Sequence, residues 1–452
     1  MKKNLNRRQF LKQSVQAGMG IAAGSTLLNS CSQLGIRGTV PPPYPMKPLK
    51  EVRIGFIGAG GMGSAHISNL MNIKGARIVA VCDIVEDKVK RVQEWHKEKG
   101  MPVPEGYSQG DFDFKRMNDR NDLDLIYIAT PWKWHVPMAV DAMKKGKHTA
   151  IEVPAAVTVA GCWELVETSE ATKKHCSMME NCNYDRVEMM ILNMVKKGMF
   201  GELIHAQCGY LHDLRAILYS EEGEGLWRRD HYINRDGDLY PTHGLGPVAQ
   251  CMDINRGNNF KYIVSMSSKS RGLNLFAEEF FGKDSKEARE KIKTGDVVVT
   301  MIKNYNGETI VLTHDTTLPR PYSRDIYVQG TNGLIRKYPT PKIHLKDKSP
   351  HHRWESIDPY MEKYEHPLWI KMREEMEGAA GHGGMDYLED YRLVNSYLNG
   401  VEPDMDVYDA AMLSAISELS EKSIAKRGKP IRYPDFTRGM WQKKRKLHVM
   451  EV

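Results

Sequence analysis

The stretch VRIGFIGAGGMGSAH (residues 52–66) decides the fold of this 452-residue chain. It starts as a short apolar run, which is typical of a buried parallel strand, and it ends in glycines followed by helical spacing. Gly58, Gly60 and Gly63 form the pattern G-x-G-x-x-G, which lets backbone N–H groups approach a pyrophosphate at the start of a helix. The stretch therefore predicts the first strand, turn and helix of a dinucleotide-binding domain.

The residues that follow continue an alternation of strands and helices. Further strands are expected at ARIVAVCD (76–83), LDLIYIAT (123–130) and HTAIEV (148–153), with helices over residues 86–99, 136–145 and 159–173. Such alternation predicts a doubly wound parallel sheet, that is, an N-terminal Rossmann domain of the α/β class.

Asp83 ends the second predicted strand, about 20 residues after Gly63, where dinucleotide-binding domains hold the ribose. Its carboxylate can accept hydrogen bonds from both ribose hydroxyls of NAD and would repel the 2′-phosphate of NADP. The sequence therefore favours NAD as the cofactor.

After residue 183 the strands follow one another with few helices between them. They are expected at LIHAQCGYL (203–211), YIVSMSS (262–268), VVVTMIKNY (297–305), ETIVLTHDTT (308–317) and RDIYVQG (324–330), and helices are expected over residues 186–197, 368–377, 386–398 and 410–426. This pattern predicts a C-terminal α+β domain with an open, mainly antiparallel sheet. We expect a Rossmann domain over residues 51–183 and a substrate-binding domain over residues 184–452.

The N-terminus is typical of an export signal. NRRQFLK (6–12) has the paired arginines of a twin-arginine signal, and residues 15–28 form an apolar stretch too short to span a bilayer. LLNSC resembles a relaxed lipobox, in which Cys31 is lipidated; an ordinary cleavage site is the alternative. Residues 1–31 are therefore expected to be a signal and residues 32–50 a Pro-rich linker, and the protein to be periplasmic or a membrane-anchored lipoprotein.

The composition excludes some classes of protein. A net charge of +7 is modest for this length, and lysines and arginines are interspersed with acidic residues, so no nucleic-acid partner is expected. The remaining cysteines contain no CxxC pair, and a chain that folds in the reducing cytosol before export has little use for disulfides. Neither disulfides nor a metal cluster are expected.

Two further motifs follow predicted parallel strands. ATPWKWHVPMA places Trp132 and His135, and IEVPAAV places Glu152, at carboxyl ends that line the ligand crevice of such sheets. In the second domain, LYPTHGLGP places Tyr240, Thr242 and His243 in a turn bounded by Gly and Pro, from which polar side chains can enter a cleft. The histidine can exchange protons near neutral pH.

Together these motifs resemble the Gfo/Idh/MocA sugar oxidoreductases over about residues 52–336. Those enzymes usually carry E-K-P, whose lysine assists proton transfer, whereas this chain has Glu152-Val153-Pro154. TPWKWH, EVPAA, ENCNY, GYLHDLR, LWRRDH, YPTHGLGPVAQ and SMSS narrow the resemblance to glycoside hydrolase family 109, which are NAD-dependent exo-acting α-N-acetylgalactosaminidases. The resemblance runs through most of the mature chain.

The resemblance implies a set of site residues. Besides the motif glycines, NAD contacts are expected at Met62, Gly63, Asp83, Trp132, Lys133, Trp134, His135, Glu152, Val153 and Asn181. Substrate contacts are expected at Tyr210, Arg228, Tyr240, Pro241, Thr242, His243 and Tyr322. Proton transfer is assigned to His243, with Tyr240 or Tyr184 assisting.

The resemblance also implies a cycle without net redox change. C3 of a terminal α-linked N-acetylgalactosamine is oxidised, a base removes the acidified C2 proton, the aglycone leaves C1, water adds, and C3 is reduced again. One tightly bound NAD then suffices, which agrees with export of a folded, loaded protein. The alternatives are an exported sugar oxidoreductase with net redox turnover and a non-catalytic sugar-binding lipoprotein; the open sheet of the second domain suits a homodimer.

Overall fold

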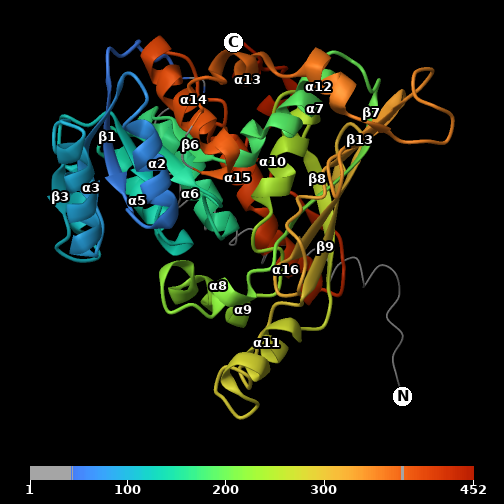
Figure 1. Cartoon of the computed structure of the whole chain (residues 1–452), viewed down its shortest axis with the longest axis horizontal. Helices are drawn as coiled ribbons and strands as arrows, with labels where there is room; N and C mark the ends of the chain where they lie inside the picture. The colour runs from blue at the N-terminus through green and yellow to red at the C-terminus, as the bar shows by residue number, and fades with distance from the viewer. Residues whose placement is uncertain (1–41, 43, 378–380, 452) are drawn as a thin grey trace, which may run out of the picture. The chain divides into compact units, whose positions relative to one another are not determined.

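The first sheet contains six parallel strands. The computed structural model describes residues 42, 44–377 and 381–451. The strand order is β3-β2-β1-β4-β5-β6 (Figure 1), and the strands are β1 (Val52–Ile57), β2 (Ala76–Cys82), β3 (Glu105–Tyr107), β4 (Leu125–Ile128), β5 (His148–Glu152) and β6 (Cys176–Met179). From β1 the successive strands are added first on one side, as β2 and β3, and then on the other, as β4, β5 and β6. In doubly wound sheets the ligand crevice opens at this change of side, between β1 and β4. The predicted Rossmann sheet is confirmed.

Helices cover both faces of this sheet. They are α2 (Gly61–Leu70), α3 (Glu86–Glu98), α4 (Asp113–Asn118), α5 (His135–Lys144) and α6 (Val159–Thr172). Two helices from near the C-terminus, α14 (Met385–Asn399) and α15 (Val407–Ser414), return to pack on α2 and on α6 and β6, respectively. Because the strands are covered on both sides, β4 is buried along its whole length. The end of the chain therefore contributes side chains to the neighbourhood of the dinucleotide turn.

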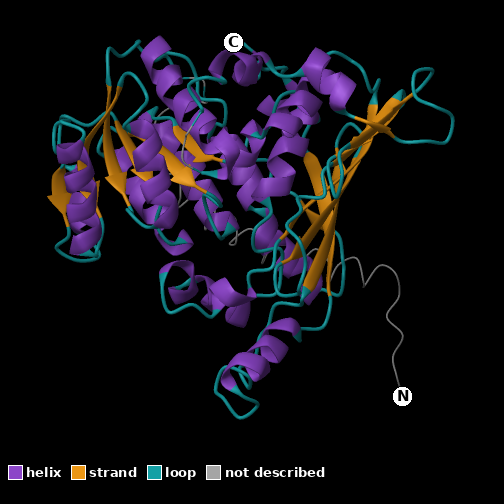
Figure 2. Ribbon diagram, viewed as in Figure 1, coloured by secondary structure: helices purple, strands orange, loops and turns teal. Residues whose placement is uncertain are grey.

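The second sheet has nine strands in the order β14-β13-β12-β11-β7-β10-β9-β8-β15. Figure 2 shows its long, twisted strands in orange, apart from those of the first sheet. The strands are β7 (Leu203–Leu211), β8 (Phe260–Ser267), β9 (Val297–Asn304), β10 (Thr309–Asp315), β11 (Tyr327–Gly330), β12 (Gly333–Arg336), β13 (Lys342–Leu345), β14 (Glu355–Ser356) and β15 (Ile431–Arg432). Only β10 and β7 pair in parallel, so the sheet is mainly antiparallel, as predicted.

Helices of the second part are more numerous than the sequence predicted. They are α7 (Arg186–Lys196), α8 (Arg215–Leu218), α9 (Arg228–Asn234), α10 (Thr242–Cys251), α11 (Gly272–Phe281), α12 (Asp358–Tyr364), α13 (Pro367–Met372) and α16 (Ile416–Ala425). The helix α10 packs against β7, α7 and α15, between the two sheets (Figure 1). Its first residues therefore lie beside both sheets, close to the end of β6 in the first sheet and to β7 in the second.

The prediction of a turn at residues 240–243 is wrong in one respect, because Thr242 and His243 begin α10. The following glycines serve close packing. A Cβ on Gly244 would lie 2.4 Å from the backbone nitrogen of Gly209, and a Cβ on Gly246 would lie 2.8 Å from Oδ1 of Asn183. The helix approaches its neighbours too closely for side chains at these positions, so the glycines do not mark a turn.

The predicted signal, Cys31 and most of the Pro-rich linker lie outside the described residues. Within the described ranges, no helix is long and apolar enough to cross a membrane. The cysteines in these ranges, Cys82, Cys162, Cys176, Cys182, Cys208 and Cys251, are all buried free thiols.

Candidate active site

The glycine turn after β1 has the geometry of a dinucleotide site. Gly58 has a φ of 94°, and a Cβ there would lie 2.3 Å from the carbonyl oxygen of Ala129. A Cβ on Gly63 would lie 1.8 Å from the carbonyl oxygen of Gly58, so the turn and the helix touch through glycines alone. No side chain caps the start of α2, which leaves its first N–H groups free for a phosphate.

Asp83 stands where the ribose of NAD is expected. One carboxylate oxygen accepts from the backbone N–H of Ala59 and the other from that of Val85, each at 2.9 Å. These bonds fix the carboxylate beside the glycine turn, and each oxygen keeps a lone pair for a ribose hydroxyl. The turn and Asp83 therefore fit NAD.

The residues of TPWKWH have different tasks. Trp132 is buried and lies 5.6 Å, between ring centroids, from Tyr240 of the second part of the chain. The Trp134 ring instead packs edge-on against Phe112, at 5.6 Å. His135 is fully buried, and its ring nitrogens lie 2.7 Å from the carbonyl oxygen of Thr130 and 2.9 Å from that of Pro154. His135 thus ties the two crevice segments together, and its ring does not reach the crevice.

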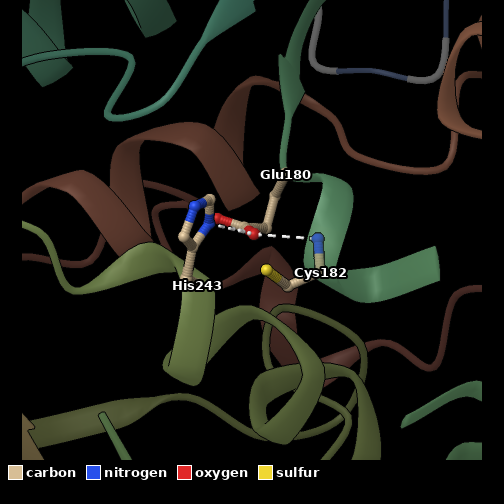
Figure 3. Close-up of side chains that lie close together, drawn as sticks. All are labelled: Glu180, Cys182 and His243. Atoms are coloured by element: carbon tan, nitrogen blue, oxygen red, sulfur yellow. Dashed lines mark hydrogen bonds and ion pairs between the residues drawn. The ribbon is translucent and has the colours of Figure 1, made fainter. Parts of the chain in front are cut away.

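His243 forms a pair with Glu180, a residue that the sequence analysis did not assign (Figure 3). Nδ1 of His243 lies 2.7 Å from Oε1 of Glu180, which also accepts from the backbone N–H of Cys182 at 3.1 Å. Glu180 is fully buried, whereas 14% of the His243 side chain is exposed. Burial acts to raise the pKa of the Glu180 carboxyl, but the His243 imidazole outweighs it and the pKa lies below its ordinary value. The pair is a buried carboxylate that orients an accessible imidazole.

Aromatic rings and one arginine surround this pair. The Tyr240 ring lies 4.8 Å from the His243 ring and 4.6 Å from the Tyr210 ring, and Tyr210 lies 6.2 Å from Tyr322. The Arg228 guanidinium stands over Tyr240, 4.7 Å from its centroid. Arg228 forms an ion pair with Glu224 through Nη1. Its Nε and Nη2 are buried, and the guanidinium lies close enough to the Tyr210 and Tyr232 hydroxyls to lower the pKa of both phenols against the effect of burial.

Three of the remaining predicted residues, Glu152, Asn181 and Thr242, lie close to the residues above, and one other lies apart from them. Glu152 accepts from the backbone N–H of Val153 and contacts His66, and the Asn181 amide donates to Asp386 at 2.7 Å. Thr242 is buried, and its hydroxyl lies close enough to Glu180 to help lower the pKa of that carboxyl. The exception is Tyr184.

The Tyr184 hydroxyl donates to Asp404 at 3.0 Å, and Asp404 in turn binds Arg392 at 2.8 Å. This hydroxyl belongs to a buried ion-pair network, away from the His243 pair. Burial raises the pKa of the Tyr184 phenol well above its ordinary value, so it releases a proton with difficulty.

Glu180, Cys182 and His243 also form a group with the donor types of a metal site, since one ligand atom from each lies within 4.8 Å of the others (Figure 3). Two features favour the acid–base interpretation. The Cys182 thiol already donates to Oδ1 of Asn181, with 3.3 Å between the two atoms. The His243 and Glu180 ligand atoms already bond to each other.

Comparison with known proteins agrees with this geometry. A sequence profile described as an oxidoreductase family with an NAD-binding Rossmann fold matches residues 52–180. A second, described as the C-terminal domain of glycosyl hydrolase 109, matches residues 184–443. The chain belongs to glycosyl hydrolase family 109. This membership confirms the resemblance seen in the sequence and the prediction of a glycoside hydrolase.

Relatives of full length support the same assignment. A glycosyl hydrolase family 109 protein of Solibacter usitatus (strain Ellin6076) is 47% identical over 97% of this chain and 98% of its own length. A protein of Shewanella oneidensis (strain MR-1) named alpha-N-acetylgalactosaminidase is 40% identical, with 99% of each chain covered.

Solved structures with the same fold are more distant in sequence. An NAD-binding oxidoreductase from Klebsiella pneumoniae has a TM-score of 0.66 at 15% identity, covering 86% of this chain and 100% of its own. An inositol dehydrogenase homologue from Azotobacter vinelandii, solved with NAD⁺, has a TM-score of 0.62 at 15% identity and covers 86% of this chain and 99% of its own. At this identity the likeness concerns the fold alone.

Proposed function

We propose that this family 109 enzyme removes terminal α-linked N-acetylgalactosamine from glycans or glycosides with the help of one bound NAD. The observation that carries the proposal is the His243–Glu180 pair, with 2.7 Å between Nδ1 and Oε1, at the edge of the NAD-binding sheet. The name of the Shewanella oneidensis relative, which spans the whole chain, supports the choice of sugar.

Most glycosidases act through two carboxylates that flank the scissile bond, one as acid and one as base or nucleophile. Here the carboxylates at the ends of β5 and β6, Glu152 and Glu180, each already contact a histidine. Val153 replaces the lysine of the related dehydrogenases, and valine cannot carry a proton. Proton transfer at the oxidised hydroxyl therefore falls to the His243–Glu180 pair, which favours the oxidation–elimination route.

Arg228 and the aromatic cluster of Tyr210, Tyr240 and Tyr322 bind different parts of the sugar. Arg228 offers Nε and Nη2 to sugar oxygens, and the rings of Tyr210, Tyr240 and Tyr322 shape the walls around it. His243 accepts the proton of the C3 hydroxyl as that carbon is oxidised, and it returns the proton when C3 is reduced. Glu180 holds the His243 ring in one orientation and stabilises the imidazolium that forms.

When bound, NAD supplies reversible removal of hydride from C3, which acidifies the C2 proton. The glycine turn and Asp83 would hold the pyrophosphate and the ribose. Because the cofactor is restored in every cycle, one tightly held molecule serves many turnovers. Such an enzyme can work where free NAD is scarce.

We also propose export in the folded state, because the twin-arginine motif at residues 6–12 suits a protein that is loaded with its cofactor before transport. Lipidation of Cys31 would then anchor the enzyme to a membrane. Mass spectrometry of the mature N-terminus tests both: a diacylglyceryl group on Cys31 is expected, and an unmodified N-terminus at another residue excludes the anchor.

A homodimer through the second sheet is a further proposal. Met266, Val299 and Met301 on β8 and β9 are exposed, and together they form an apolar face on adjacent strands. Light scattering of the mature protein is expected to give twice the chain mass, and Met301→Glu is expected to give the monomer. A wild-type monomer at high concentration excludes this interface.

The experiment that tests the function uses the mature protein without added cofactor and p-nitrophenyl α-N-acetylgalactosaminide in D₂O. Nitrophenol release, with deuterium at C2 of the sugar product, is the expected result, because the C2 proton is exchanged during the cycle. No release, together with reduction of NAD by free sugars, would instead establish a sugar oxidoreductase. Absence of both NAD and turnover would indicate a sugar-binding protein.

A further inference from the structure

A second histidine–carboxylate arrangement lies at the end of β5, the strand next to β6. Nε2 of His66 lies 2.6 Å from Oε1 of Glu152, and Nδ1 of His66 lies 2.9 Å from both carboxylate oxygens of Asp390. His66 and Asp390 are fully buried, whereas 14% of the Glu152 side chain is exposed. The order Asp390–His66–Glu152 therefore runs from the interior of the protein to the crevice.

The inner end of this row is firmly held. Asp390 lies on α14 and accepts further hydrogen bonds at 3.2 Å from the amide of Asn69 and the hydroxyl of Tyr127. His66 lies on α2, one turn after the dinucleotide glycines, and α14 packs on α2. The C-terminal part of the chain thus fixes the orientation of a side chain at the cofactor crevice.

The carboxylates of the two arrangements lie at the ends of neighbouring strands. Glu152 ends β5 and pairs in register with Met179 of β6, and Glu180 follows Met179 directly. Burial is the main reason that the pKa of the Tyr240 phenol lies well above its ordinary value, and the charges of Glu152 and Glu180 add to this rise. Both carboxylates are therefore close enough to act on the same side chain of the sugar pocket.

The proposed cycle needs two different proton acceptors, because the C3 hydroxyl proton and the C2 proton leave from adjacent carbons in consecutive steps. We propose that Glu152 accepts the C2 proton and that His66 and Asp390 are positioning residues that make this possible. This inference rests on the proposed function and adds the second acceptor to it.

Removal of the C2 proton, loss of the aglycone and addition of water follow one another. Glu152 takes the C2 proton, the C2–H electron pair forms the C1–C2 double bond, and the C1–O pair leaves with the aglycone oxygen. Water then adds its hydroxyl group to C1, and its other proton ends on the aglycone oxygen. The proton on Glu152, whose side chain is partly exposed, exchanges with solvent in the meantime, and Glu152 then protonates C2. The C3 step before and after belongs to His243.

Asp390 explains how Glu152 can change its charge inside the protein. If His66 had Glu152 as its only partner, a proton on Glu152 would leave a buried imidazolium without a counter-charge, which is costly. With Asp390 at 2.9 Å the imidazolium stays paired throughout. Glu152 is then free to alternate between carboxylate and acid while its orientation stays fixed.

The test uses His66→Gln and Asp390→Asn in the full mature enzyme with its bound NAD. His96→Gln is the matched control, because His96 is a buried histidine on a Rossmann helix whose Nδ1 bonds only to its own helix, at the Val92 carbonyl. The readouts are the NAD retained per chain, nitrophenol release, the near-ultraviolet absorbance of reduced nicotinamide during turnover, and the isotope effect of a C2-deuterated substrate.

Both variants are expected to retain NAD and to lose kcat by about 10- to 100-fold with little change in KM, as for other residues that orient a reacting group. Reduced nicotinamide is expected to accumulate, because oxidation at C3 is intact and removal of the C2 proton is slow. The C2 isotope effect is expected to rise above that of the wild type, and the control is expected to match the wild type.

Wild-type kcat in both variants, or a fall in kcat without reduced nicotinamide and without a larger isotope effect, would overturn the inference. If His66→Gln does not fold, Asp390→Asn decides alone, because it keeps the shape of the side chain. Failure of the proposed function would look different, since the wild-type enzyme itself would then release no nitrophenol.

Discussion

His66 and His243 contact carboxylates at the ends of the neighbouring strands β5 and β6, but their surroundings differ. His66 has carboxylates at both ring nitrogens and no exposed surface. His243 has Glu180 at Nδ1, while its Nε2 has no hydrogen-bond partner among the described residues and part of its side chain is exposed. One histidine therefore has a nitrogen left for a substrate, and the other has none.

This difference separates a proton-transfer group from a positioning group. A histidine with both nitrogens engaged must break a bond before it can take a substrate proton, and inside the protein that bond involves charged groups. A histidine with one oriented nitrogen and one free nitrogen is ready for general base catalysis. The free nitrogen matters more for the role than the carboxylate partner does.

His243→Ala gives the largest expected effect on activity and tests whether His243 is the proton-transfer group. The variant is expected to keep NAD and to lose about 10³- to 10⁴-fold in kcat, the upper part of the range for a general base. No reduced nicotinamide is expected on addition of substrate, since C3 is not oxidised. Steady-state kinetics and absorbance during turnover measure both; turnover near the wild-type value removes His243 from the mechanism.

The fold was predictable because its signals are local. The glycine turn of β1 and α2, the acidic residue after β2 and the apolar strands all lie in short stretches with a recognisable period. The helix α10 was missed because Gly244, Gly246 and Pro247 normally interrupt helices, and only the close approach to β7 and η3 (Asn181–Tyr184) explains the two glycines. Tertiary packing overrode the local signal.

His66→Leu tests whether the ion pairs of the positioning histidine stabilise the protein. Removing the imidazole leaves Asp390 and Glu152 without their cation, which is expected to lower the free energy of unfolding by about 3 to 5 kcal/mol. Urea unfolding of the variant, the wild type and His96→Leu measures this. A loss equal to that of the control would mean that the buried ion pairs contribute nothing specific.

The difference in the free energy of unfolding between the wild type and His66→Leu is expected to depend on pH. Burial acts to lower the pKa of His66, but the Asp390 and Glu152 carboxylates outweigh it and raise the pKa well above 6.5. A raised histidine pKa adds stability that is complete below about pH 6.5 and is lost as the pH rises through the folded-state pKa. The difference between wild type and His66→Leu is therefore expected to shrink above neutral pH. The other groups near His66 are Asp386 and Glu389 of α14 and Tyr127 of β4, which both proteins share.

The site was predictable only in part, because pairs between distant residues leave no pattern in the sequence. Of the residues implied by the family resemblance, Tyr210, Tyr240 and Arg228 gather around His243, whereas His135 and Trp134 pack inside the Rossmann domain and Tyr184 binds Asp404. Glu180 stood next to a quoted motif, but its bond to His243 joins the end of β6 to the start of α10. Likewise, nothing in the sequence connects His66 with Asp390.

Glu180→Gln is expected to have a smaller effect on activity, and it tests whether the carboxylate stabilises the His243 imidazolium. The amide keeps the size of the side chain but does not stabilise the imidazolium, so kcat is expected to fall by about 10- to 100-fold with KM nearly unchanged. The matched variant Glu188→Gln removes another fully buried carboxylate, one that binds Arg324 at 2.9 Å. It is expected to change stability and to leave the proton step alone. A similar fall in kcat in both variants would show that Glu180 acts only through the fold.

Tyr184→Phe gives the smallest expected effect on activity. It tests whether Tyr184, which lies in the ENCNY motif, takes part in proton transfer. Its hydroxyl is engaged by Asp404, so its loss is expected to change kcat by less than about 10-fold, well below the loss expected for a proton-transfer group. Unfolding is expected to become easier by about 1 to 3 kcal/mol, because Asp404 loses a buried donor. Tyr240→Phe is the counterpart inside the aromatic cluster, 4.8 Å from the His243 ring, and is expected to lower kcat more. If Tyr184→Phe loses as much activity as His243→Ala, the Asp404 hydrogen bond must open during turnover, and the distinction between engaged and free groups fails at this residue.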